Sequence, residues 1–511
     1  MVTDDILSLS EWSSNRLKSS KFFAKPLLIL IVTVLGFLVM GYHPGIEDDG
    51  VYLAAVKADL QPALYPHDSD FFRLQLQATV FDRWMADFVD VSRIPVPWAE
   101  LMWQFLSFLG ILWAAHSIAQ QLFPEARAQW GGVATLAAML TLPVAGTALY
   151  LVDQHLHPRN IATALILMAV SRILARKPWH SVPLLLVALV MHPIMAALGI
   201  SFCVFLSIAL TERVNVGLGS WRGSMAAAVP LGWMFEPPSP TWRRALQTRT
   251  YYFLFQWTWY EWLGAIAPLI LFWLLWRFAQ KRGETLLARF ALGVVFYGVF
   301  QQAVAMIMLT PSALVRLTPL QPMRFLHLIY LFMVLMAGCL LGRYLLKASI
   351  GRWSVFLLVV NGPMFASQQI LFGGSQHLEL PWRTSANPWL QAFEWIHSNT
   401  PVDAYFALDP NYLAAPGEDY HSFRALAERS QLADAIKDTA VVTQVPELGP
   451  RWAKQVDAQA GWKGFQLADF ERLKAEFGID WVLVSYPQPA GLKCQWHNHL
   501  LSVCAIPGPG R

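Results

Sequence analysis

The 511-residue sequence predicts a polytopic α-helical membrane protein with a small α/β domain at its C-terminal end. Two observations carry this prediction. Hydrophobic residues make up 55% of the chain and charged residues only 14%, whereas about 25% of a typical soluble domain is charged. Several apolar runs of roughly 20 residues are each long enough to cross a hydrocarbon core about 30 Å thick. A transmembrane β-barrel would instead show alternating segments of about ten residues.

The first apolar run follows a polar start of the chain, residues 1–24, which we expect to be a cytoplasmic tail. No small-x-small cleavage site follows this run, so it reads as a signal anchor rather than a cleaved signal peptide. The candidate membrane spans are 25–42, 98–121, 129–150, 159–175, 181–210, 223–235, 259–279, 286–309, 323–342 and 352–373.

The basic residues predict the orientation of these spans, because positive loops stay in the cytoplasm. One basic cluster precedes the first span, and three more follow the spans that end near 175, 279 and 342. These four basic clusters all lie on the cytoplasmic side only if the segment 181–235 crosses the membrane an odd number of times. Since His192-Pro193 interrupts 181–210, this run is either two short helices, giving eleven crossings with 223–235, or one tilted helix, giving nine. We favour eleven.

Both solutions place the same loops on the extracytoplasmic side. We therefore expect a bacterial inner-membrane protein, whose transmembrane domain covers 25–373 and whose periplasmic α/β domain covers 374–511. The net charge of +4 gives no indication of nucleic-acid binding, because the basic residues lie in short loops between apolar runs. The external loops are 43–97, 151–158, 236–258 and 310–322.

Loop 43–97 is longer than an ordinary connection, so we expect it to be structured, with helices at 49–60 and 71–91. It opens on three consecutive acids, which are costly to hold near a low dielectric unless they bind or transfer something. Capping of a helix N-terminus is the alternative explanation. The acids of this loop that we select are Glu47, Asp48, Asp49, Asp68 and Asp70.

The second external loop carries Asp153, His155, His157 and Arg159 at the mouth of a span. The two histidines and the acid could ligate a divalent metal, although hydrogen-bonded interfacial histidines are the plainer interpretation. Arg159 suits bidentate binding of a phosphate, and snorkelling to lipid headgroups explains it equally well.

The fourth external loop and the start of the next span carry two arginines and a histidine, and the third external loop combines arginines with aromatic residues. Such a mixture can bind an anionic lipid head and its tail, and an interfacial amphipathic helix is the alternative. An ionisable pair one helical turn apart, as at 324 and 327, is a functional candidate at the outer end of a span. The residues selected here are Arg243, Arg244, Arg249, Arg316, Arg324 and His327.

The C-terminal segment predicts helices at 387–398, 423–436 and 469–477, strands at 404–408 and 480–485, and a hairpin over 491–506. Cys494 and Cys504 flank the hairpin turn in an oxidising compartment, so we expect a disulfide between them. No nucleophile and base share a suitable spacing in this segment. We therefore expect it to shape or cover the membrane site.

The acidic first loop, Glu47-Asp48-Asp49 followed by a helix and Asp68-Ser69-Asp70, together with the predicted topology and external C-terminal domain, resembles the GT-C superfamily of membrane glycosyltransferases. The resemblance implies transfer of a sugar from a polyprenyl-phosphate or polyprenyl-diphosphate donor to an extracytoplasmic glycan, lipid or protein. An acid of the 47–49 cluster would be the general base, while arginines and histidines of the other loops would hold the lipid phosphate.

Asp48 and Asp49 diverge by roughly 100° if they lie on a helix, so they cannot share one role. We assign Asp49 as the base and Asp48 as a residue that orients the acceptor or binds a cation. A metal cofactor, Mg or Mn, would be held by Asp48, Asp49, His155 and His157. No motif fixes the sugar, and Trp257-Thr-Trp-Tyr-Glu-Trp262 is only superficially similar to the tryptophan-rich motif of oligosaccharyltransferases.

Two other classes of function compete with the transferase. A proton-coupled transporter or flippase would need polar residues deep inside spans, where we find few: His116, His192, Gln301 and Gln302. We find no clear inverted repeat either. The third class is a non-catalytic scaffold for envelope polysaccharide assembly, in which the acids only cap helices.

Overall fold

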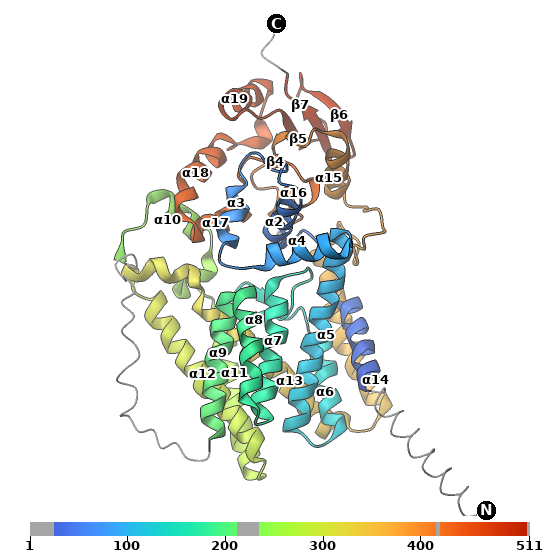
Figure 1. Ribbon diagram of the computed structural model, residues 1–511, viewed down its shortest axis with the longest axis vertical. Coiled ribbons are helices and arrows are strands. Elements are labelled where there is room, and N and C mark those ends of the chain that lie inside the picture. The colour runs from blue at the N-terminus through green and yellow to red at the C-terminus, as the bar shows by residue number, and fades with distance from the viewer. Residues whose placement is uncertain (1–24, 212–234, 415–419, 508–511) are drawn as a thin grey trace, which may run out of the picture.

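The computed structural model describes residues 25–211, 235–414 and 420–507. The described chain forms a bundle of long helices, a layer of short helices above the bundle, and a β-sheet farthest from it (Figure 1). The layer of short helices combines segments that lie far apart in the sequence.

The bundle is compatible with a helical membrane protein. Among the described residues, six helices are long and apolar enough to cross a membrane. Helix α14 exposes apolar side chains, as a lipid-facing helix does: Ile350, Leu358 and Ile370 are 84%, 75% and 81% exposed. The six spans are α5 (Val96–Leu122), α9 (Pro193–Leu210), α11 (Trp259–Lys281), α12 (Thr285–Leu309), the continuous Pro322–Leu346 that contains α13 (Leu326–Leu340), and α14 (Ile350–Leu371).

Shorter helices complete the bundle: Lys25–Met40, α6 (Ala126–Ala138), α7 (Pro158–Leu174) and α8 (Val182–Met191). The predicted run 181–210 is two helices, because Pro193 lacks an N–H and the chain turns at His192, whose Nδ1 caps α9. The candidate span 223–235 lies almost wholly outside the described residues. Helices α6 and α13 pack closely through glycines: a Cβ on Gly338 would lie 2.5 Å from the carbonyl oxygen of Gly131.

The first external loop forms three helices of the middle layer, α2 (Asp49–Leu60), α3 (Asp70–Leu76) and α4 (Phe81–Ser92). Helix α2 matches the predicted 49–60. The single helix predicted over 71–91 is wrong, because the chain breaks at 77–80. There the Val80 N–H donates to the Val190 carbonyl, and the Thr79 hydroxyl accepts from the Phe81 N–H.

The chain after 387 forms a five-stranded sheet of order β4-β3-β5-β7-β6, with β3 parallel to β4 and β5. The strands are β3 (Tyr405–Ala407), β4 (Ser430–Gln431), β5 (Trp481–Ser485), β6 (Lys493–His497) and β7 (Leu501–Ala505). The helices are α15 (Pro388–Asn399), α16 (Phe423–Ala427), α17 (Lys437–Gln444), α18 (Gly449–Ala458) and α19 (Leu467–Phe477). The helix predicted over 423–436 is wrong, since β4 follows the short α16.

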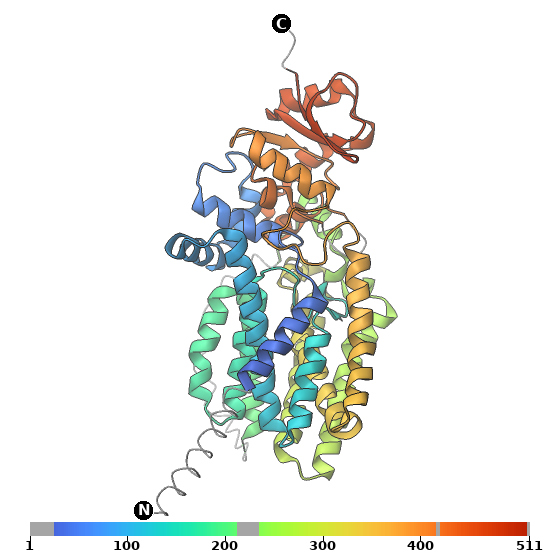
Figure 2. The same cartoon turned by 90° about the vertical axis from the view of Figure 1, so that its right-hand side faces the viewer.

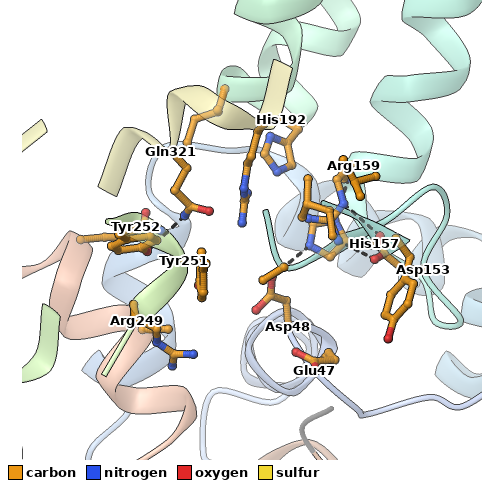
Figure 3. A pocket seen from close by; sticks show the side chains of 18 of the residues that line it. Glu47, Asp48, Asp153, His157, Arg159, His192, Arg249, Tyr251, Tyr252 and Gln321 are labelled. Atoms are coloured by element: carbon orange, nitrogen blue, oxygen red, sulfur yellow. Dashed lines mark hydrogen bonds and ion pairs between the residues drawn. The ribbon is translucent and has the colours of Figure 1, made fainter. Parts of the chain in front are cut away.

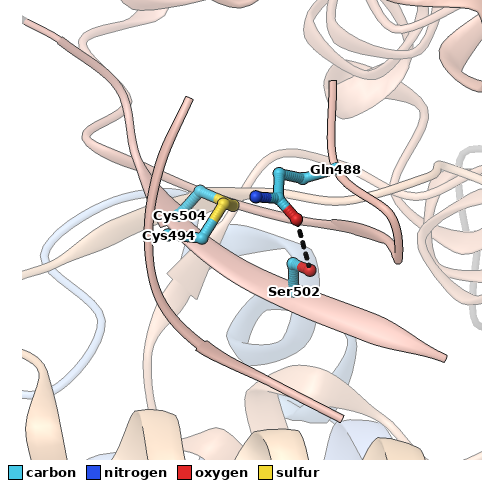
Figure 4. The surroundings of a disulfide bond; sticks show 4 residues. All are labelled: Gln488, Cys494, Ser502 and Cys504. Carbon is cyan, nitrogen blue, oxygen red and sulfur yellow. Dashed lines mark hydrogen bonds between the residues drawn. A yellow bond between two sulfur atoms is a disulfide. The ribbon is translucent and has the colours of Figure 1, made fainter. Parts of the chain in front are cut away.

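Cys494 and Cys504 form a disulfide that joins the paired strands β6 and β7 (Figure 4). Beside it, the Ser502 hydroxyl and the Gln488 side chain are 3.4 Å apart. The remaining two cysteines, Cys203 and Cys339, are buried and free.

The first loop and the C-terminal segment pack together as one body, which both views show above the bundle (Figure 2). Their shared apolar core includes Phe71 of α3, Trp242 of α10 (Pro240–Gln247), Val441 of α17 and Trp452 of α18. Polar contacts add to it: Lys57 Nζ lies 2.7 Å from the Glu428 carboxylate. The first loop and the C-terminal segment therefore together cover one end of the bundle, and we call this covering layer the roof.

Candidate functional site

A cavity of about 990 Å³ lies between the bundle and this roof. Residues of all four external loops line it, together with α17 of the C-terminal segment and the hairpin of β1 (Pro143–Val144) and β2 (Leu149–Tyr150). Figure 3 shows Asp48 at its centre, with His157 and Asp153 on one side and Tyr251 and Tyr252 on the other. The loops that we selected for their charged residues thus meet in space.

Asp48 is the carboxylate that faces the cavity. It immediately precedes α2, and its side chain is 38% exposed. Its Oδ1 lies 3.2 Å from Lys437 Nζ, and its Oδ2 lies 3.5 Å from His157 Nε2. Burial alone would raise the pKa of Asp48, but the charges of Lys437 and His157 hold it well below its ordinary value. Asp48 is therefore ionised at neutral pH.

Asp49, which we favoured as the base, does not line the cavity. It is 2% exposed, its Oδ2 accepts a hydrogen bond of 2.5 Å from the Gly45 N–H, and it shares another with Glu100 of α5. Burial raises the pKa of Asp49 to about 7. The divergence of adjacent residues on a helix turns Asp49 into the bundle when Asp48 faces the cavity. Of the two acids, Asp48 is therefore the one that faces the cavity.

Glu47 lies at the edge of the cavity, where its carboxylate is 3.2 Å from Lys437 Nζ. Its backbone is left-handed, with a φ of 47°, which is unusual for a residue with a side chain. This turn sets the direction in which α2 begins, and so places Asp48 over the cavity.

The loop before α7 supplies a connected group of buried side chains. Arg159 forms a bidentate pair with Asp153, with Nε and Nη2 at 3.1 and 2.5 Å from the two carboxylate oxygens. His157 Nδ1 accepts from the Arg159 N–H at 2.9 Å, so a neutral His157 carries its proton on Nε2, toward Asp48. Arg159 thereby retains Nη1, a buried donor for which no hydrogen-bond partner is found within the described chain.

His155 lines the same cavity and is 2% exposed, and burial lowers its pKa to about 3. Neither of its ring nitrogens has a hydrogen-bond partner among the described residues. Burial opposes ionisation of Asp153, but Arg159 outweighs it and holds the pKa of Asp153 below its ordinary value. The loop thus presents a neutral imidazole next to a fixed ion pair.

Arg324, which precedes α13, and Arg249 also line the cavity. Arg324 Nε is a second buried donor without a hydrogen-bond partner in the described ranges. Arg249 donates to the Ile436 carbonyl, and Gln321 donates to the Tyr252 hydroxyl at 3.1 Å. Arg159 and Arg324 thus each present a buried donor without a hydrogen-bond partner among the described residues at the cavity.

Besides Asp49, six of the selected residues lie outside the cavity. Asp68 accepts from Gln455 at 2.8 Å and from the Tyr405 hydroxyl, and Asp70 pairs with Arg451 at 2.7 Å. These acids dock the first loop on the C-terminal segment. A binding role for them does not fit this arrangement, because their oxygens are occupied by side chains far along the chain.

The other four are paired with residues elsewhere in the protein or face solvent. Arg244 pairs with Asp457 at 2.7 Å, Arg316 donates to the Glu236 carbonyl at 2.8 Å, and Arg243 is exposed on α10. His327 is buried in α13, with Nε2 at 2.9 Å from the Leu151 carbonyl oxygen. His327 therefore faces the bundle although Arg324, one turn earlier, lines the cavity.

The metal site expected at Asp48, Asp49, His155 and His157 does not form as a group. Asp49 is turned away, and within the described ranges the one cluster of three or more His, Cys, Asp or Glu side chains close enough to hold an ion lies elsewhere. Lys437 is a charged residue of the cavity that the sequence did not reveal. It lies on the short helix α17, 390 residues after Glu47 in the sequence, and no local pattern marks it.

The arrangement can accept a proton at Asp48 and hold an anion between Arg159 and Arg324. The surrounding tyrosines and the apolar residues Val144, Leu149 and Met191 offer contacts for a sugar ring or lipid chain. Comparison of the chain with protein-family models and with curated proteins finds no match.

Proposed function

We propose that the protein is a membrane glycosyltransferase of the GT-C type, which transfers a sugar from a polyprenyl-phosphate or polyprenyl-diphosphate donor to an extracytoplasmic acceptor. In this proposal Asp48 is the general base, and Arg159 and Arg324 hold the phosphate of the donor. The supporting observation is that an ionised carboxylate and two buried, unused arginine donors line one cavity at the end of a membrane-type bundle.

The proposed reaction follows from these positions. The acceptor hydroxyl gives its proton to Asp48, its oxygen forms the new bond to the anomeric carbon, and the bond to the lipid phosphate oxygen breaks. The leaving phosphate gains negative charge, which Arg159 and Arg324 stabilise by hydrogen bonds formed in a site shielded from water. His157 keeps Asp48 oriented through Nε2 and is a positioning residue.

The test begins with mass spectrometry of lipids that copurify with the protein, followed by transfer assays with those donors, with and without chelator. Arg324→Gln is expected to lower transfer about 100-fold, because one donor to the leaving phosphate is lost. Arg243→Gln is the matched control, since Arg243 is exposed outside the cavity. Movement of the lipid across vesicle membranes without bond cleavage would favour the flippase, and absence of any bound lipid or transfer would favour the scaffold.

A further inference from the structure

A second cluster of polar side chains lies apart from the cavity, where the end of the first helix meets the chain after α14. His43, Glu379 and His421 converge there from three segments, and their ligating atoms all lie within 4.8 Å of one another. His421 Nε2 is 2.7 Å and His43 Nδ1 is 3.5 Å from the same Glu379 oxygen, Oε2. Their side chains are 3%, 0% and 7% exposed in the order His421, His43, Glu379.

Several polar atoms of the cluster have no hydrogen-bond partner in the described part of the protein. Neither ring nitrogen of the fully buried His43 has a hydrogen-bond partner among the described residues, and Glu379 Oε1 also lacks one. A buried polar atom left without a partner costs about 1–3 kcal/mol. Because the imidazole of His43 stacks on the Phe372 ring at 4.0 Å, it is held with Nδ1 toward Glu379. A fixed imidazole whose nitrogens make no hydrogen bond within the described chain, beside a carboxylate oxygen that also makes none, points to a missing ligand.

The separation between His43 and Glu379 fits a tetrahedral metal ion. In such a site, ligands at about 2.0–2.2 Å from the ion lie roughly 3.3–3.5 Å from one another. The distance of 3.5 Å between His43 Nδ1 and Glu379 Oε2 has this length. The distance of 2.7 Å between His421 Nε2 and Glu379 Oε2 is shorter, because these two atoms are hydrogen-bonded to each other. Two imidazoles and one carboxylate are the donor set preferred by Zn²⁺, whereas Mg²⁺ prefers oxygen ligands and water.

We propose that His43, Glu379 and His421 bind a zinc-class divalent ion. Backbone bonds already align the three segments: the Glu379 N–H donates to the Tyr42 carbonyl at 2.9 Å, and the Ser422 N–H donates to the Gly45 carbonyl at 2.8 Å. The ion therefore ties the chain just before the acidic loop to the C-terminal segment. It fastens the roof over the bundle, and this role does not depend on the reaction at the cavity.

The test uses the full-length protein in detergent, stripped with a chelator and reloaded with Zn²⁺ or Co²⁺. We expect one zinc per chain by elemental analysis, a lower midpoint of thermal unfolding after stripping, and recovery of the midpoint on reloading. Cobalt should give the intense visible absorption of tetrahedral nitrogen and oxygen coordination. Less than about 0.1 zinc per chain after reloading, with an unchanged midpoint, would overturn the proposal and leave a metal-free hydrogen-bonded cluster.

Substitutions of the proposed ligands test where the ion binds. Glu379→Gln and His421→Ala should each lose stoichiometric zinc, whereas His180→Gln should keep it, because His180 is exposed at the opposite end of the bundle. Asp48→Asn should also retain the zinc, which separates this site from the cavity. Full zinc content in both Glu379→Gln and His421→Ala would contradict the assignment. If these variants do not fold, the cobalt spectrum and the chelator response of the unmodified protein still decide.

Discussion

Two adjacent carboxylates of this protein have opposite surroundings. Asp48 faces Lys437 and His157 at the cavity, and its pKa is held low, while Asp49 is buried and its pKa is raised to about 7. Because burial raises the pKa of Asp49 above its value in the unfolded chain, the fold loses stability as pH rises from about 4 to about 7. Asp49 therefore fits a structural role, in which its oxygen closes the turn at Gly45.

Substitution of the two acids distinguishes these roles. Asp48→Asn removes the base and is expected to lower sugar transfer by about 10²- to 10⁴-fold, with an unchanged thermal midpoint. Asp49→Asn keeps an oxygen for the Gly45 N–H and is expected to change transfer by less than about tenfold. Asp90→Asn is the control, because Asp90 pairs with Arg93 in solvent. Loss of transfer in Asp49→Asn alone would restore the original assignment.

Sequence reasoning identified part of the cavity because charge at the end of a membrane-type helix is rare enough to be noticed. It found Asp48, His155, His157, Arg159 and Arg324 in this way. It could not separate Asp48 from Asp49, since the choice depends on which face of α2 packs on the bundle. It also selected Asp68 and Asp70, whose partners Gln455 and Arg451 lie far along the chain.

At the scale of elements, long apolar helices were predictable because their length and composition are local properties. The same holds for α2, α15 and α19, whose periodicity or caps are visible in the sequence. The break between α3 and α4 depends on a hydrogen bond to Val190, and β4 depends on pairing with β3. Such long-range contacts override local preference, which is why the helices predicted over 71–91 and 423–436 were wrong.

The position of α2 depends on close approach of its backbone to the C-terminal segment. A Cβ on Gly50 would lie 2.5 Å from the Cβ of Ser422. Gly50→Ala is therefore expected to cost about 1–3 kcal/mol of stability and to lower transfer by moving Asp48. Gly351→Ala in α14 is the control, since its added Cβ meets nothing within 4 Å. Thermal unfolding and transfer assays check both variants, and an unchanged Gly50→Ala would show that the two segments separate readily.

At the scale of the whole molecule, the bundle has two ends: the cavity lies at one, and the exposed residue Lys281, which closes α11, lies at the other. The two free native cysteines are buried, so single introduced cysteines can report sidedness. If the cavity faces the periplasm, Gln247→Cys on exposed α10 should react with an impermeant maleimide in intact cells. Lys281→Cys should react only after permeabilisation. The reverse pattern would place the cavity in the cytoplasm and exclude a periplasmic acceptor.

The C-terminal segment is part of the cavity rather than only a cover, because Lys437 of α17 sets the charge state of Asp48. Removing an opposite charge at 3.2 Å raises the pKa of the Asp48 carboxylate, because the charged form loses its stabilising partner. Since the base must be ionised, Lys437→Gln is expected to move the acidic limb of the kcat/KM profile to higher pH. Transfer would fall at low pH and recover as pH rises. Lys454→Gln is the control, because Lys454 pairs with Glu476 away from the cavity. An unshifted acidic limb in Lys437→Gln would mean that Asp48 is not the base that Lys437 tunes.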